Sequence, residues 1–275
     1  MARGLEERVL GLVRGKGLVK RGDRVLVSVS GGKDSAVAAW ILARRAGELG
    51  TEVGLLHIDL GIPGYSDESR AAVKELQRAL DVPLHVHEIE KEWGMPLPEI
   101  ARRLGKAPCH VCGILKRYYQ NALARELGYN VLATGHNLDD SVGFIVNNFI
   151  TGQIEYIHKI SPVLPETELS PRKIKPLFWI QGKEIVRYAL ENGIPFSRRK
   201  CPFQRQSPTH VIREAFDRIE EIRPGAKKSL VKNVWRAVPK GEEESTPNAC
   251  KYCGAPTSGK VCTVCRMKGR LGVQI

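Results

Sequence analysis

The 275-residue sequence contains no long apolar run. No stretch approaches the roughly 20 residues of a membrane-spanning helix, and residues 1–8 lack the uninterrupted apolar core of a signal peptide. Internal repeats and low-complexity tracts are also missing. These absences predict a cytosolic protein with no membrane segment. The length suits one large α/β domain with a small appendage.

Cysteine is missing from the first 108 residues, and all seven cysteines of the chain come later. In a reducing compartment such cysteines argue for metal binding or catalysis rather than for disulfides. Acidic side chains are also scarce, because 30 Asp and Glu face 43 Lys and Arg, which gives a net charge of +13. That excess favours a polyanionic partner, nucleic acid first, although a generally basic surface would give the same count.

A Gly-rich hexapeptide lies between two apolar runs, residues 24–29 and 36–43. The first run predicts a buried strand ending at Val29, and the second predicts a helix. Two glycines let the backbone turn sharply and point N–H groups at one spot, beside a helix start that attracts anions. The pattern therefore predicts a phosphate cradle, although its spacing is neither GxxxxGK[ST] nor GxGxxG. The hexapeptide is Ser30, Gly31, Gly32, Lys33, Asp34 and Ser35.

Two side chains of the hexapeptide have a predicted task of their own. Lys33 adds a mobile positive charge to the cradle, and Ser35 is suited to capping the helix. After the hexapeptide, strand and helix patterns alternate, which predicts a parallel sheet with right-handed crossovers. The expected strands are 24–29, 52–59, 82–88 and 130–134, with a fifth strand or an ordered turn at 173–180. The expected helices include 66–80, 113–127, 141–150 and 183–192.

Ligands of such sheets lie beyond the carboxyl ends of the strands. His57, Ile58 and Asp59 stand at that end of the second predicted strand. His57 and Asp59 could flank an adenine or a ribose, but a core histidine is an equally good interpretation of His57.

The fourth predicted strand leads to Gly135, and the acidic pair Asp139 and Asp140 follows shortly after it. Asp140 is the better candidate for binding Mg²⁺ or positioning ATP, because carboxylates bridge magnesium to phosphate. Capping of the next helix explains both aspartates as well, and the two roles can coexist.

The last cysteines form two CxxC pairs separated by eight residues. Four thiolates in two such knuckles suit tetrahedral zinc. A segment this small cannot bury a core, so the metal is expected to supply its folding free energy. The predicted zinc ligands are Cys250, Cys253, Cys262 and Cys265.

Three earlier cysteines, Cys109, Cys112 and Cys201, are far apart in sequence. Two interpretations compete. Three thiolates could hold a [4Fe–4S] cluster that leaves one iron open. Alternatively, one cysteine could carry a persulfide that another resolves, because a CxxC at a helix start is expected to lower the thiol pKa.

Two helical segments follow Cys201. Residues 209–222 predict an amphipathic helix with Ile219 and Ile222 among its inward side chains, and a basic helix comes next. Such charge runs are usually solvated, yet an RNA-facing role has equal weight beside the net charge. The expected organisation is an N-terminal helix at 1–22, a catalytic domain at 23–205, C-terminal helices at 206–238, a polar linker at 239–249 and a zinc ribbon at 248–275.

The sequence SGGKDS resembles the PP-loop of the N-type ATP pyrophosphatases, which cleave ATP between the α and β phosphates. Further motifs occur with it in order, namely residues 108–118, residues 133–140, Cys201-Pro202 and the terminal double CxxC. The set is similar to the TtcA/TtuA family of tRNA 2-thiolation enzymes, most of all to the branch that modifies the T-loop uridine. One feature departs from it, because close relatives often carry an N-terminal zinc ribbon and no cysteine precedes Cys109 here.

The resemblance implies a parallel-sheet PP-loop ATP pyrophosphatase domain, related to the adenine nucleotide alpha hydrolases, with a C-terminal zinc ribbon. It implies a [4Fe–4S] cluster on Cys109, Cys112 and Cys201, and functional roles for Lys116 and Asp140. Sulfur in that branch comes from a ubiquitin-like carrier with a C-terminal thiocarboxylate, and relatives are commonly homodimers. The implied ATP-binding residues are Val29, Ser30, Gly31, Gly32, Lys33, Asp34, Ser35, His57, Ile58, Gly135 and Asp140.

The expected reaction is attack of a tRNA uridine C2 oxygen on the α-phosphorus of ATP, followed by sulfur transfer that releases AMP. Its rivals are cluster-free thiolation through a persulfide, reaction of an adenylate with ammonia or an amine, and a non-catalytic zinc-ribbon protein that binds tRNA. The sequence leaves the target open among the T-loop uridine, the wobble uridine and an anticodon-loop cytidine.

Overall fold

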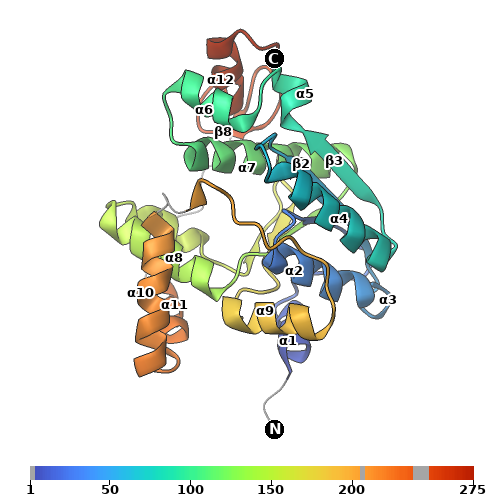
Figure 1. Ribbon diagram of the computed structural model, residues 1–275, viewed down its shortest axis with the longest axis vertical. Coiled ribbons are helices and arrows are strands. Elements are labelled where there is room, and N and C mark those ends of the chain that lie inside the picture. Colours follow the sequence, from blue (N-terminus) through green and yellow to red (C-terminus); the bar gives the residue numbers. More distant parts are fainter. Residues whose placement is uncertain (1–3, 205–207, 238–247) are drawn as a thin grey trace.

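The computed structural model describes residues 4–204, 208–237 and 248–275. At its centre is a six-stranded sheet with the order β3-β2-β1-β4-β6-β5 (Figure 1). All its strands are parallel except β5, which pairs antiparallel to β6 at the edge. The strands are β1 (Arg24–Ser28), β2 (Glu52–Asp59), β3 (Leu84–Glu88), β4 (Val131–Thr134), β5 (Val163–Leu164) and β6 (Arg172–Ile174).

Helices cover both faces of this sheet, as a parallel sheet requires. Successive strand residues point to opposite faces, so Val25 and Val27 join the core under α1, α2, α4 and α9, whereas Leu26 joins the core under α5, α6 and α7. The helices are α1 (Leu5–Gly15), α2 (Lys33–Arg44), α3 (Ala46–Leu49), α4 (Ser66–Leu80), α5 (Ile89–Trp93), α6 (Leu97–Leu104), α7 (Pro108–Glu126), α8 (Leu138–Ile150), α9 (Gly182–Glu191), α10 (Pro208–Ile222), α11 (Ala226–Ala237) and α12 (Thr263–Leu271), with a 3₁₀ helix η1 (Ile154–Lys159). No described helix is both long and apolar enough to cross a bilayer.

A third core joins α8 to η1, α10 and α11 at the lower left of Figure 1. The prediction that Ile219 and Ile222 face inward on α10 is wrong, because they are 42% and 87% exposed. The buried residue there is Glu220, whose carboxylate accepts the backbone N–H groups of Gly225 (2.8 Å) and Lys227 (2.9 Å). The turn between α10 and α11 therefore decides which face of α10 is covered.

The C-terminal ribbon consists of β7 (Asn248–Ala249), β8 (Pro256–Thr257) and α12, and α12 lies against α6 and α7 (Figure 1). Val264 and Met267 share a core with Trp93. The ammonium group of Lys268 lies 2.7 Å from Glu92. The ribbon thus gains apolar and ionic contacts from the main domain, in addition to whatever a metal contributes.

The expected parallel α/β architecture is confirmed, and the differences lie at element ends. Helix α7 begins at Pro108, five residues before the expected start, because proline suits the first position of a helix. The expected fifth strand is the short β6, and β5 was not anticipated. The expected N-terminal helix stops at Gly15. The expected boundary at 205/206 and most of the expected linker at 239–249 lie outside the described residues.

A buried lysine, Lys227, joins α8, α10 and α11. The residue is 1% exposed, and its ammonium group donates to Asp139 (2.6 Å) and to Asp217. The other carboxylate oxygen of Asp139 accepts the N–H of Gly182 at the start of α9 (2.8 Å). Asp139 therefore ties three helices together around one buried charge.

Replacing Asp139 should destabilise the protein strongly. In Asp139→Ala the ammonium group of Lys227 stays buried with one remaining carboxylate, and breaking such a pair costs about 3–5 kcal/mol. The matched control is Asp217→Ala, because the side chain of Asp217 is 59% exposed and such a pair is worth about 1 kcal/mol or less. Urea unfolding followed by circular dichroism measures both changes, and equal small effects would contradict the role assigned to Asp139.

Candidate functional site

The loop of residues 30–35 connects β1 to α2 at the carboxyl edge of the sheet. Gly31 has a φ of +84°, and a Cβ atom there would lie 2.8 Å from the Cα of Ser69 in α4. Only glycine combines that backbone conformation with so close a neighbour. Both the conformation and the space at Gly31 therefore select glycine.

Helix α2 begins at Lys33 with Gly32 as its N-cap, so Ser35 is not the cap that the sequence predicted. The hydroxyl of Ser35 instead accepts the N–H of Ser30 (3.1 Å) and donates to the carbonyl of Gly32 (3.0 Å). These two bonds close the loop on itself. The start of α2, where backbone N–H groups have no helical partner, remains suited to an anion.

The loop after β4 packs directly on this cradle. A Cβ atom on Gly135 would lie 2.5 Å from the backbone nitrogen of Ser35, so the two backbones touch. The amide of Asn137 donates to Asp34 (3.1 Å), and the ammonium group of Lys33 lies 2.8 Å from the same carboxylate. The structure thus brings the hexapeptide and Gly135 together as the sequence predicted, with Lys33 held near the mouth of the loop.

The residues expected beside the nucleotide on β2 have different environments. His57 is buried, its Nδ1 lies 2.9 Å from the carbonyl of Val29, and its Nε2 has no described partner. Burial lowers the pKa of His57, so a neutral ring donates from Nδ1 and leaves Nε2 as an acceptor. Ile58 is a core side chain, and the carboxylate of Asp59 accepts from Arg70 (2.8 Å) and from the N–H of Gly61 (2.9 Å).

The two neighbouring aspartates have separate roles. Asp139 belongs to the buried pair with Lys227. Asp140 accepts the N–H of Asn137 (2.9 Å) in a capping box at the start of α8 and forms an ion pair with Arg213 of α10. The capping role is therefore real for Asp140, and its carboxylate has a second, cationic partner in Arg213.

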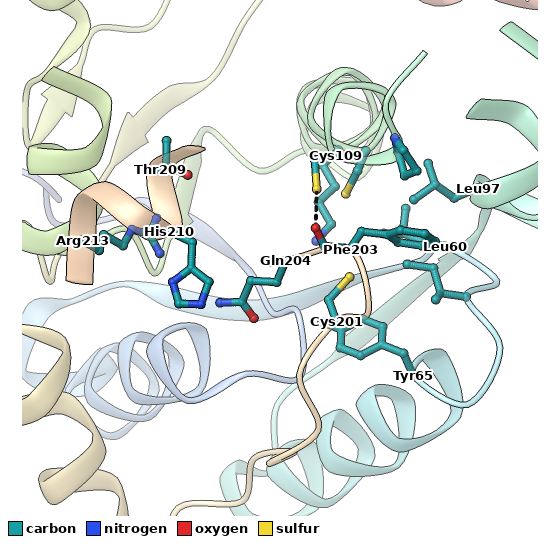
Figure 2. A pocket seen from close by; sticks show the side chains of 14 residues that line it. Leu60, Tyr65, Leu97, Cys109, Cys201, Phe203, Gln204, Thr209, His210 and Arg213 are labelled. Atoms are coloured by element: carbon teal, nitrogen blue, oxygen red, sulfur yellow. Dashed lines mark hydrogen bonds between the residues drawn. The ribbon is translucent and has the colours of Figure 1, made fainter. Parts of the chain in front are cut away.

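The three early cysteines line one cavity of about 270 Å³. Figure 2 shows the sulfur atoms of Cys109 on α7 and Cys201 opposite it both pointing into this space. The thiol of Cys109 donates to the carbonyl of Phe203 (3.4 Å). Cys112 and Lys116 follow Cys109 on the same helix and also line the cavity. The structure therefore brings together the three cysteines that the sequence assigned to sulfur chemistry, with Lys116, for which the resemblance implied a functional role.

Charge is concentrated at this cavity. Burial raises the pKa of Cys109, and the thiolates of Cys112 and Cys201 raise it further, so the expected lowering of a thiol pKa is wrong for Cys109. The charge that Cys112 carries when it is ionised is the main cause that raises the pKa of Lys116, which keeps the ammonium group charged. Burial is the main cause that lowers the pKa of His57 at the carboxyl end of β2, and the ammonium group of Lys116 adds to it.

One chain segment physically connects the cavity to the phosphate cradle. The N–H of Ser197 donates to the carbonyl of Gly31 (2.8 Å). Cys201 is four residues further along, and an extended chain spans at most about 3.6 Å per residue. The Cα of Cys201 therefore lies within roughly 14 Å of the Cα of Ser197, and Ser197 is itself bonded to the cradle at Gly31.

The C-terminal cysteines form a compact set of ligands. The sulfur atoms of Cys250, Cys253, Cys262 and Cys265 all lie within 4.8 Å of one another. Backbone N–H groups point at them, as Cys262 donates to the sulfur of Cys250 (3.2 Å) and Cys265 to that of Cys262 (3.4 Å). This arrangement suits one tetrahedral metal ion. The three early thiols do not form so tight a group.

Some residues of the site were missed by sequence reasoning. Arg213 lines the cysteine cavity and pairs with Asp140, which is 73 residues away in sequence. Lys175 follows β6 directly and lies in the field of Asp140. Nothing in the local sequence pattern distinguishes these two cations from solvated ones.

Comparisons with known proteins agree with this geometry. The PP-loop domain family matches residues 5–215. A tRNA-5-methyluridine(54) 2-sulfurtransferase of Pyrococcus horikoshii is 37% identical over 255 residues, which are 92% of this chain and 80% of that protein. The Thermus thermophilus protein of the same name is 37% identical over 250 residues, which are 90% of this chain and 76% of that protein.

A solved structure is similar over nearly the whole chain. The U34-tRNA thiolase NcsA from Methanococcus maripaludis, determined with its [4Fe–4S] cluster, superimposes with a TM-score of 0.83 at 26% sequence identity. The match covers 98% of this chain and 88% of that one. Sequence, site geometry and architecture lead to one conclusion: the chain belongs to the PP-loop family of tRNA sulfurtransferases.

Proposed function

We propose that this protein uses ATP to replace the C2 oxygen of a tRNA uridine with sulfur, and that the T-loop uridine is its target. The observation that carries the proposal is the connection between two sites. The phosphate cradle and the three-cysteine cavity are joined by the segment from Ser197 to Cys201, and Lys116 lines the cavity beside the cysteines. The relatives named for uridine 54, at 37% identity, favour the T-loop over the wobble position.

In the first step, ATP binds with its phosphates on the cradle and Mg²⁺ beside Asp140. Backbone N–H groups at the start of α2 and the ammonium group of Lys33 stabilise negative charge on the phosphates. The uridine C2 oxygen then attacks the α-phosphorus, and pyrophosphate leaves. The C2 oxygen, a poor leaving group, becomes part of AMP, which is a good one.

In the second step, a sulfide in the cysteine cavity attacks C2, and AMP departs with the former oxygen. The thiolates of Cys109, Cys112 and Cys201 fit a [4Fe–4S] cluster, because each would bind a different iron and they need not crowd around one ion. When bound there, such a cluster supplies an iron that is open to sulfide. Lys116 stabilises the negative charge that develops as sulfur adds and AMP leaves.

We assign zinc to the C-terminal cysteines, because four thiolates at tetrahedral spacing fit that ion. The ribbon lies against α6 and α7, so its metal also supports the helix that carries Cys109 and Cys112.

The protein has three proposed partners in the cytoplasm. The substrate is tRNA, in keeping with a net charge of +13. Sulfur is delivered by a ubiquitin-like carrier with a C-terminal thiocarboxylate. A second copy of the chain completes a homodimer, for which the exposed Phe149, Ile150 and Ile222 of α8 and α10 offer apolar surface.

Loss of the protein should remove one thionucleoside from cellular tRNA. Mass spectrometry of digested tRNA from deletion cells is expected to lack the 2-thiolated T-loop uridine. Complementation with Lys33→Ala or Lys116→Ala should fail to restore it, because one variant weakens phosphate stabilisation and the other the sulfur step. Complementation with Lys232→Ala, an exposed lysine of α11, should restore it. Persistence of that nucleoside in deletion cells would refute the proposed target.

The two cysteine sets should hold different metals. Anaerobically purified protein is expected to contain about four irons and one zinc per chain. Cys201→Ser should lose iron and the brown colour but keep zinc, whereas Cys253→Ser should lose zinc first. Elemental analysis with visible absorbance measures both. A colourless, iron-free protein that thiolates tRNA with its early thiols intact would favour the persulfide route instead.

A further inference from the structure

A lysine occupies a covered position on the central sheet. Lys173 of β6 pairs in register with Leu132 of β4, which pairs with Leu26 of β1. Paired residues of parallel strands point to the same face, and both leucines are buried, at 0% and 1% exposure. Ile174, next along β6, joins the core of the opposite face. Lys173 therefore points to the α7 side of the sheet, where the pattern calls for an apolar residue.

Other cations gather around Lys173. Arg117 follows Lys116 on α7, and its guanidinium lies 3.2 Å from where a Cβ on Gly113 would be, so it extends along the helix toward the CxxC turn. Lys175 follows β6 and donates to the carbonyl of Lys159 at the end of η1 (3.3 Å). Across the residues that the structure describes, no carboxylate forms an ion pair with Lys173, Lys175 or Arg117.

These charges repel one another in a partly desolvated place. Burial lowers the pKa of Lys173, and the charges of Arg117 and Lys159 lower it further. Burial lowers the pKa of Lys175 to about 8, although Asp140 opposes the shift. Cations that lie close together lower one another's pKa, and an anion bound among them stabilises their charged forms. Arg117 follows Lys116 on α7, and Lys116 lines the cysteine cavity, so such an anion would lie against the same helix as that cavity.

We propose that Lys173, Lys175 and Arg117 bind a backbone phosphate of the substrate RNA, next to the nucleotide that enters the cysteine cavity. The inference rests on the proposed function for the identity of the RNA. The phosphates of ATP are a poorer match, because β6 is two strands away from β1 and its phosphate loop, about 10 Å across the sheet. The site would fix the target base by holding the chain beside it, without reading sequence.

The test measures binding of an unmodified tRNA transcript by the full-length protein, without ATP or a sulfur donor. Lys173→Gln should weaken binding about tenfold and make the slope of log affinity against log salt shallower by roughly 0.7–0.9, the value for one lost phosphate contact. ATP affinity and the absorbance of the purified protein should not change. The matched control is Lys232→Gln on α11, which removes the same charge from an exposed position and should leave binding and slope almost unchanged.

A second variant separates binding from folding. Lys173→Leu fits the row of Leu26 and Leu132 and removes a repelled charge, so its thermal midpoint should equal or exceed that of the unmodified protein. It should nevertheless bind tRNA as weakly as Lys173→Gln. A loss of ATP affinity with tRNA binding intact would overturn the proposal, as would unchanged tRNA binding in both Lys173 variants. The binding assay measures no catalysis, so the two proposals can fail separately. If tRNA binding depends on Lys173 but the protein forms no thiouridine, the proposed function is refuted and the phosphate site is not.

Discussion

The backbone hydrogen bond from Ser197 to Gly31 is the constraint on which the site depends. Gly31 packs against Ser69 of α4. Gly135, which follows β4, packs against the same loop at Ser35. The segment from Ser197 to Cys201 crosses this loop, and it places Cys201 in the cavity with Cys109. The proposed phosphate loop thus also sets how far the third thiol can lie from it.

Most of the sheet follows from local sequence, because β1, β2, β3 and β4 are runs of β-branched and apolar residues with clear punctuation. The two-residue β5 and the three-residue β6 are different. β6 is a strand because it pairs with β4, and β5 is one because it pairs with β6. Two or three residues hold too little periodicity for the sequence to predict such a strand. The early start of α7 at Pro108 matters more, since it puts Cys109 and Cys112 in the first two turns, on neighbouring positions of one face.

The motifs predicted the parts of the site, and tertiary partners decided their roles. Asp139 and Asp140 look equivalent in sequence, yet one belongs to a buried lysine and the other to Arg213 at the cavity. Lys227 and Arg213 are both cations of the C-terminal helices, and neither carries a local signal of its partner. Long-range ion pairs of this kind depend on how helices pack, which periodicity does not encode. The partner of Asp59, Arg70 of α4, is a further case that the local sequence does not reveal.

The distribution of buried charge separates structure from function in this molecule. Away from the cleft, each deeply buried cation has a carboxylate: Arg172 with Asp23, Lys227 with Asp139, and Lys268 with Glu92. On the α7 side of β6, the described cations instead face one another. Folding alone would favour leucine in that row, since unpaired charge at a covered sheet position is unfavourable. Lys173 is only partly covered and has no described ion pair, whereas the three buried cations each have one; the proposed RNA substrate is a polyanion that would supply the missing negative charge.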